Sequence, residues 1–226
     1  GALPQREEKP ELAELKQVEF PAEPFAKDYT IESEIPKGSL LLYWPTDDGL
    51  DIHRNRRLNL LSSVFNDRLR AKVREELGST YSPRAGSNAS DTFPGYGYML
   101  SNVDVDPAAA DKMADLVIGI ADELAEKGVT ADELNRARQP LLTALKESLR
   151  SNAYWLGSVL ARAQEKPEAL DWARTRLADT ESITKEELSA FAAKYLSRGR
   201  ASRATILPVA VATKPPLMLT APPPEN

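Results

Sequence analysis

The first apolar positions of the folded region follow a two-residue period and predict β-strands. Tyr29, Ile31 and Ile35 alternate with polar residues, as expected of a half-buried strand. A turn at residues 36–38 leads into residues 40–44, a continuous apolar run of the kind that forms a buried strand. We expect these two strands to pair as a hairpin.

Residues 52–77 change to an apolar period between three and four, which predicts a long amphipathic helix ending at Gly78. The predicted buried stripe consists of Leu58, Leu61, Val64 or Phe65, Leu69, Val73 and Leu77. Two strand-like stretches follow at residues 81–89 and 95–105. Polar residues and a proline at 91–94 supply the turn between them.

Capping residues and a glycine delimit the next helices. Asp106 and Pro107 are typical of a helix start, and Gly128 is typical of its end. The buried stripe of this helix is predicted to be Met113, Leu116, Val117, Ile120 and Leu124. Thr130 and Glu133 then form the capping-box pattern of another helix.

The remaining elements are two further helices and a strand. Pro140 lies inside the helix that begins after Thr130 and predicts a kink or a break there. A further helical region is predicted from about 154 to 177, and Thr184 with Glu187 marks the start of the last helix. Residues 204–207 can form the final strand, before Pro208.

This order of elements predicts an α+β fold, with an antiparallel β-sheet and helices packed on one face, because hairpins occur where βαβ units would alternate. The proline-rich ends lack apolar periodicity. We therefore expect residues 1–24 to be a linker from a longer parent chain, residues 25–210 to form the α+β domain, and residues 211–226 to be a proline-rich tail.

Composition excludes several classes of function. The chain is 42% apolar and 28% charged with a formal charge of −5, which argues against disorder and against a polybasic nucleic-acid binder. No apolar run approaches the ~18 residues of a membrane span. We therefore expect neither nucleic acid nor a membrane as partner. Basic residues cluster at 54–57 and 68–74, where we expect solvated helix faces. The absence of cysteine excludes disulfides and thiolate metal sites.

Few residues could carry metal or nucleotide chemistry. His53 is the single histidine of the chain, and neither an H-E-x-x-H nor an H-x-x-E-H motif is present. We expect His53 to be a surface or helix-start residue, and we expect no metal ligand and no cofactor in this chain. The glycines of residues 95–98 (GYGY) do not follow the spacing of a phosphate-binding loop.

Residues 69–83 place a cation and a phenol at a helix-turn-strand corner. Arg74 lies in the last turn of the predicted helix, where the helix dipole favours a cation by roughly 0.3–1 kcal/mol, and Tyr81 opens a strand as aromatic residues often do. The same rigid corner could instead hold a peptide carbonyl and an oxyanion. Taken alone, these residues favour a structural role, in which Arg74 stabilises the helix end and Tyr81 begins a strand.

Four segments resemble a known family in sequence and order. Residues 74–83 (REELGSTYSP) resemble the R-E-x-x-G-x-x-Y-S motif of half-units of pitrilysin/insulinase-type zinc metallopeptidases. Residues 152–156 (NAYWL) resemble the N-x-Y-W-L segment of bacterial members. Residues 182–196 resemble the family's closing helix, and residues 206–208 resemble its last strand. Together these segments span about residues 28–208.

The resemblance implies the C-terminal, zinc-free half-unit, because the H-x-x-E-H motif of the N-terminal half-unit is absent. It implies a half-unit fold of the LuxS/mitochondrial-processing-peptidase-like type, with zinc in the partner half-unit, on the same parent chain or on a separate subunit. By resemblance, Arg74 would bind a substrate carbonyl near the scissile bond, and Tyr81 would donate to the carbonyl oxygen as it becomes an oxyanion. Both roles need the zinc half, so we expect this chain alone to be inactive.

Other functions stay open. Half-units of this fold also serve as non-catalytic structural subunits, and a single unit could be a peptide-binding module that captures extended chains at a sheet edge. A partner bearing H-x-x-E-H would favour the enzyme. The substrate is expected to be a peptide or an unfolded segment, and the compartment stays open between the bacterial periplasm, slightly favoured, and the cytoplasm.

We expect the chain to hold no stoichiometric zinc, because His53 cannot replace the missing pair of imidazoles. Metal analysis of chelator-washed protein that has been reloaded with zinc measures this. One tightly held zinc per chain would contradict the zinc-free assignment.

Overall fold

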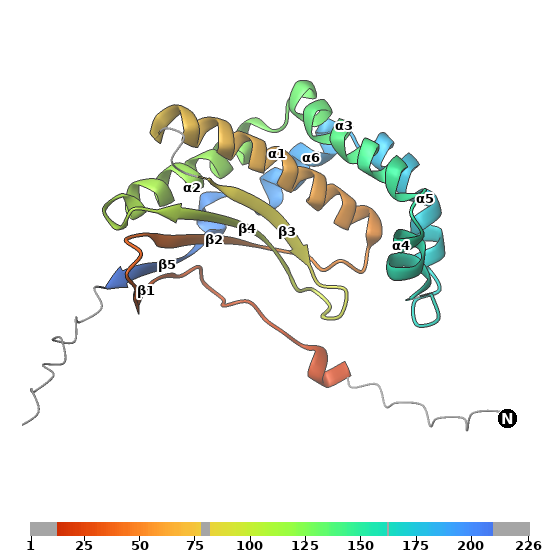
Figure 1. Ribbon diagram of the computed structural model, residues 1–226, viewed down its shortest axis with the longest axis horizontal. Helices are drawn as coiled ribbons and strands as arrows, with labels where there is room; N and C mark the ends of the chain where they lie inside the picture. The colour runs from red at the N-terminus through yellow and green to blue at the C-terminus, as the bar shows by residue number, and fades with distance from the viewer. Residues whose placement is uncertain (1–12, 78–81, 162, 210–226) are drawn as a thin grey trace, which may run out of the picture.

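The computed structural model describes residues 13–77, 82–161 and 163–209, and in these residues helices cover one face of a five-stranded sheet (Figure 1). The strands are β1 (Ala26–Glu32), β2 (Gly38–Thr46), β3 (Arg84–Ala89), β4 (Gly97–Val105) and β5 (Ser202–Val209). The α-helices are α1 (Ile52–Leu77), α2 (Ala110–Lys127), α3 (Ala131–Ser148), α4 (Asn152–Tyr154), α5 (Ala169–Ser182) and α6 (Lys185–Tyr195). Short helices of other types are η1 (Ala13–Lys16), η2 (Pro107–Ala109), η3 (Trp155–Leu160) and η4 (Arg198–Arg200).

The α+β fold is confirmed, but the first predicted hairpin is wrong. The strand order is β1-β5-β2-β4-β3, so β5 lies between β1 and β2. Tyr29 of β1 pairs with Ile206 of β5 in parallel, and Leu40 of β2 pairs with Thr205 in antiparallel orientation. Strand β2 has no free edge for β1, because β4 and β5 occupy its two edges. Strand β1 is exposed along its whole length, as an edge strand can be, and is not half-buried as predicted.

The core lies between the inner face of the sheet and the helices. Alternate residues of β2 and β4 are buried, and Trp44 packs edge-on against Phe65 of α1 with ring centroids 5.6 Å apart. The predicted stripe of α1 is confirmed where the structure describes its side chains: Leu58, Leu61, Val64, Phe65, Leu69 and Val73 are each at most 1% exposed. Helices α2 and α6 complete the layer with Met113, Val117, Leu124, Leu188 and Tyr195.

The outer face of the sheet has no helix over it in Figure 1. The residues of β2 that point to this face alternate with the buried ones and are only half-buried. These are Ser39, Leu41, Tyr43 and Pro45. The fold therefore leaves one face of the sheet available, and the candidate site lies there.

The helices largely follow their local signals. Both predicted capping boxes are present. A kink or a break was predicted at Pro140, and helix α3 continues through this residue without a break. Arg136, whose carbonyl loses its helical donor, and Pro140 are exposed, so water can replace the lost hydrogen bond. The helical region predicted from 154 to 177 is interrupted before α5, because Pro167 disfavours helix at the preceding residue.

No helix within the described residues is long and apolar enough to cross a bilayer. Residues 1–12 and 210–226 lie outside the described residues, so the limits of the linker and the tail stay predictions.

Ion pairs attach α1 to α5 and α6. Asp179 of α5, whose side chain is 8% exposed, accepts hydrogen bonds from Arg56 at 2.8 Å and from Arg57 at 3.2 Å. Arg57 also pairs with Glu187 of α6 at 2.8 Å. Burial disfavours the charged form of Asp179, but hydrogen bonds from Arg56, His53 and Arg57 outweigh burial and lower the pKa of Asp179 to about 2.

The prediction that the basic clusters at residues 54–57 and 68–74 form solvated helix faces is therefore wrong in part. Arg56 and Arg57 are engaged as described, and Arg68 donates to both carboxylate oxygens of Glu133 in α3. The reason is that the polar side of α1 meets α3, α5 and α6 instead of water. Arg70 and Arg74, beyond these contacts, are exposed as predicted.

Replacing Asp179→Asn should lower the free energy of unfolding at pH 7 by roughly 2–4 kcal/mol, because the change leaves the Arg56 guanidinium buried without a charged partner. The folded pKa of Asp179, about 2, lies below its unfolded value, so the stabilisation is complete above about pH 4 and declines as pH falls towards 2. Urea unfolding of wild type and variant from pH 7 to pH 3 measures the difference.

The matched control is Asp132→Asn. It removes an ion pair between Arg136 and Asp132, whose side chain is 78% exposed. This control should change stability by less than about 0.5 kcal/mol. A difference for Asp179→Asn that is as large at pH 3 as at pH 7 would contradict the assignment.

Candidate functional site

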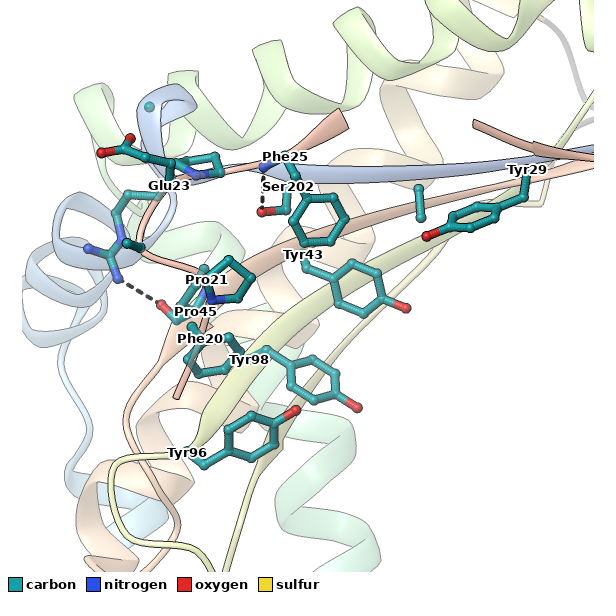
Figure 2. A pocket seen from close by; sticks show the side chains of 15 residues that line it. Phe20, Pro21, Glu23, Phe25, Tyr29, Tyr43, Pro45, Tyr96, Tyr98 and Ser202 are labelled. Atoms are coloured by element: carbon teal, nitrogen blue, oxygen red, sulfur yellow. Dashed lines mark hydrogen bonds between the residues drawn. The ribbon is translucent and has the colours of Figure 1, made fainter. Parts of the chain in front are cut away.

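Tyrosine side chains form a row across the outer face of the sheet. Figure 2 shows Tyr29 of β1, Tyr43 of β2, Tyr98 of β4 and Tyr96, just before β4, lying in sequence across the strands. The rings of Tyr43 and Tyr98 meet edge-on at 5.5 Å, and those of Tyr96 and Tyr98 at 6.1 Å. We call these four residues the aromatic face.

The turn before β4 is fixed by a buried carboxylate. Asp48, 9% exposed, accepts a hydrogen bond from the amide of Gly95 at 2.7 Å through one oxygen and pairs with Arg54 through the other. A Cβ atom on Gly97 would lie 2.1 Å from the carbonyl oxygen of Asp47, so only glycine fits between the two tyrosines of this turn. The β2–α1 loop thus sets the position of Tyr96.

Residues 17–25, here called the strap, run along the outer face before β1 begins (Figure 1). The ring of Phe20 stacks on Tyr96 with centroids 4.7 Å apart and an interplanar angle of 9°. At the other end, the amide of Phe25 donates to Ser202 Oγ at 3.3 Å, and its carbonyl accepts from the amide of Arg203 at 2.7 Å. The strap is therefore held at Phe20 and at Phe25, while residues 21–24 between them are exposed.

A cavity of about 790 Å³ lies between the strap and the sheet (Figure 2). Its only charged lining residues within the described part of the chain are Glu23 and Arg200, and Arg200 donates to the carbonyl of Pro45 at 3.0 Å. The lining residues are Phe20, Pro21, Ala22, Glu23, Pro24, Phe25, Tyr29, Tyr43, Pro45, Tyr96, Tyr98, Gly199, Arg200, Ser202 and Ala204.

Neutral phenols supply the polar groups of this cavity. Burial, together with the neighbouring phenols of Tyr98 and Tyr96, raises the pKa of Tyr43. The Tyr43 hydroxyl therefore stays protonated at neutral pH and can donate a hydrogen bond. The hydroxyl of Tyr98 accepts one from Asn88 at 3.0 Å. Such a cavity suits an uncharged apolar ligand with carbonyl groups better than a phosphate or a metal ion.

Arg74 lies at the exposed end of α1, away from this cavity lining. No described residue forms a hydrogen bond or an ion pair with its guanidinium. Tyr81 lies outside the described residues, so the proximity of the two side chains stays a prediction. At the start of β3, the amide of Ala85 donates to Asn66 of α1 at 3.0 Å, which attaches β3 to the helix that carries Arg74.

His53 is a surface residue at the start of α1, as predicted. Its side chain is 60% exposed, and its Nδ1 lies 2.8 Å from an oxygen of Asp179. Among the described residues no three histidine, aspartate or glutamate side chains are arranged to hold a metal ion.

The sequence predictions did not identify the aromatic face. Residues 95–105 are predicted to be strand-like, but residues 95–98 are weighed as a site only against the spacing of a phosphate-binding loop. Tyr96 and Tyr98, two positions apart, point to the same side of a strand. The same alternation places Tyr43 on the side opposite the buried Leu42 and Trp44. This two-residue spacing was the signal in the sequence.

Comparison of the sequence with protein families gives a match to the family described as the peptidase M16 inactive domain, over residues 1–141. The chloroplastic stromal processing peptidase of Pisum sativum is 36% identical over 107 residues, which cover 47% of this chain and 8% of that protein. The Arabidopsis thaliana protein of the same name is 33% identical over 107 residues, with the same coverage. The chain thus matches less than a tenth of the length of these relatives.

Solved structures share the fold. A peptidase M16 inactive domain from Pseudomonas fluorescens has a TM-score of 0.68 and 24% identity, covering 88% of this chain and 47% of that one. The periplasmic protease PqqL from Escherichia coli has a TM-score of 0.68 and 17% identity, covering 83% and 21%. The inactive peptidase domain of a Bordetella parapertussis protein has a TM-score of 0.66 and 17% identity, covering 83% and 99%.

Substituting Phe20→Ala should raise hydrogen exchange at the Phe25 amide, the strap amide that donates to Ser202 Oγ, by roughly 2- to 10-fold, because one aromatic stack contributes about 0.5–1.5 kcal/mol. The melting temperature should change little, since the stack lies outside the core. Hydrogen–deuterium exchange with mass spectrometry measures the effect. Leu15→Ala, at a side chain 71% exposed on η1, is the control and should leave strap exchange unchanged. Equal exchange in both variants would contradict the described strap position.

Proposed function

Because the chain belongs to the family of peptidase M16 inactive domains, we propose that it is the non-metal-binding half of a zinc endopeptidase and completes a substrate chamber with a zinc-bearing half. The family match over more than half of the chain carries this proposal. In the assembled enzyme, Arg74 and Tyr81 would act on substrate at a zinc site that the H-x-x-E-H half supplies.

The relatives support a peptide substrate and a larger assembly. The Pisum sativum relative is named as a processing peptidase, and the Escherichia coli relative as a protease. This chain covers 47% of the Pseudomonas fluorescens chain, which leaves room there for a second unit of similar size. The zinc half of the present protein would lie on the same parent chain or on a separate subunit.

The state of the arginines on α1 supports a role for Arg74 outside its own domain. Arg56, Arg57 and Arg68 are all engaged in ion pairs between helices. Arg70 and Arg74, by contrast, are exposed, and neither guanidinium has a polar partner in the part of the chain that the structure describes; Arg74 is the one on the last turn. An arginine in this position keeps its five donors available for a carbonyl on a bound peptide. The H-bond donor of Tyr81, seven positions later, would serve the developing oxyanion.

In the assembled enzyme, Tyr81→Phe should lower kcat by something on the order of 10²-fold with a smaller change in KM, because the lost donor acts mainly on the oxyanion of the transition state. Arg74→Ala should also raise KM, since a donor to a ground-state carbonyl contributes to substrate binding. Steady-state kinetics on the purified complex with the zinc-bearing half measure both effects.

Arg70→Ala provides the matched control, because Arg70 is an exposed cation one turn earlier on the same helix. It should retain wild-type kinetics. Melting temperatures of all variants separate loss of activity from loss of folding. Wild-type turnover by the Arg74→Ala/Tyr81→Phe double variant would refute the catalytic role and leave a structural subunit of the same fold as the better interpretation.

A further inference from the structure

The strap carries a sequence pattern that matches the surface beneath it. Residues 20–25 read Phe-Pro-Ala-Glu-Pro-Phe, so Pro21 and Pro24 have the P-x-x-P spacing, and a phenylalanine flanks each of them. P-x-x-P segments adopt the extended polyproline conformation and bind grooves lined by aromatic side chains. The strap here lies against such a lining, with Phe20 stacked on Tyr96.

We propose that the aromatic face and its cavity form a binding site for extended polypeptide segments that carry prolines flanked by aromatic residues, and that the strap occupies part of this site in cis. The occupant is therefore a segment with the chemistry of residues 20–25, supplied by another polypeptide. The strap and the incoming segment compete for the same rings.

The chemistry on the sheet side of the cavity fits this occupant. The cavity of about 790 Å³ is the space left beside the strap, and residues 20–25 form one of its walls. On the sheet side, four tyrosines and Pro45 supply most of the lining, and the guanidinium of Arg200 is already bonded to Pro45. Since no described residue bonds to the hydroxyl of Tyr43, this phenol is available to a backbone carbonyl of the ligand.

The strap is held weakly enough to be displaced. The Phe20 ring makes an apolar contact with Tyr96. Among the described residues, the hydrogen bonds between the strap and the sheet are those of the Phe25 amide and carbonyl. Residues 21–24 are exposed, so leaving the surface costs them little buried area. A competing segment can thus enter from the Tyr96 side while β1 stays paired with β5.

The inference extends the proposed function, because a chamber wall that holds such segments would select aromatic- and proline-bearing substrates. The test of this inference does not require the protein to cleave a peptide. Binding is measured on this chain alone, without the zinc half, so failure of this site and failure of the chamber proposal give different results.

The test uses a fluorescein-labelled peptide of residues 17–26 (QVEFPAEPFA) and fluorescence anisotropy on the full 226-residue chain. Phe20→Ala, which weakens the competing strap, should bind the peptide on the order of 10-fold more tightly than wild type. A peptide in which both prolines and both phenylalanines are replaced by serine should not bind. No saturable binding to Phe20→Ala at millimolar protein, or equal binding of the serine peptide, would overturn the proposal.

Two second-site changes locate the peptide on the aromatic face. Adding Tyr98→Ala to Phe20→Ala should abolish binding, whereas adding Tyr154→Ala, a tyrosine of α4 outside the cavity, should not. Ala204→Phe fills the cavity from β5 and should also abolish binding, which decides the question even if Tyr98→Ala lowers the melting temperature. Undiminished binding by folded Ala204→Phe protein would overturn the assignment to this cavity.

Discussion

The packing of α1 on the inner face of β2 and β4 is the interaction on which the rest of the structure depends. Trp44 and Phe65 meet at its centre, and each fully buried leucine around them contributes about 1.5–3 kcal/mol. Helices α2 and α6 pack on the same face. Since the apolar stripes of these helices are used there, the outer face stays without a helix, and its tyrosines remain available to the strap and to ligands.

The polar side of α1 explains why its two ends differ. Arg56 and Arg57 near its start meet Asp179 and Glu187, so this end is enclosed by α5 and α6. No described residue pairs with Arg74 at the other end. One helix thus joins the layers at its beginning, whereas its end presents Arg74 without a polar partner among the described residues.

Local signals in the sequence were sufficient for most of the helices, though not for the interruption before α5, and insufficient for the strand order of the sheet. The capping boxes at Thr130 and Thr184 involve residues three positions apart, and the α1 stripe depends on spacing alone, so both could be predicted. The pairing of β1 with β5 joins opposite ends of the chain, and no local pattern specifies it. The exposed position of Arg74 follows from its place on the polar side of a helix and could be predicted. The two-residue spacing of Tyr96 and Tyr98 places both on one side of a strand, but their assembly with tyrosines of β1 and β2 depends on the strand order and could not be predicted.

The parallel pairing of β1 with β5 also determines how the domain would bear mechanical load. The chain enters this pair of strands at Ala26, which lies opposite Arg203, and leaves it at Val209, which lies opposite Glu32. A force that pulls the two flanking segments apart is therefore directed along the strands and loads the interstrand hydrogen bonds together, in shear. Antiparallel edge strands with the same exits would separate one bond at a time. A sheet built this way resists being peeled open at β1 when its two flanking segments are pulled apart.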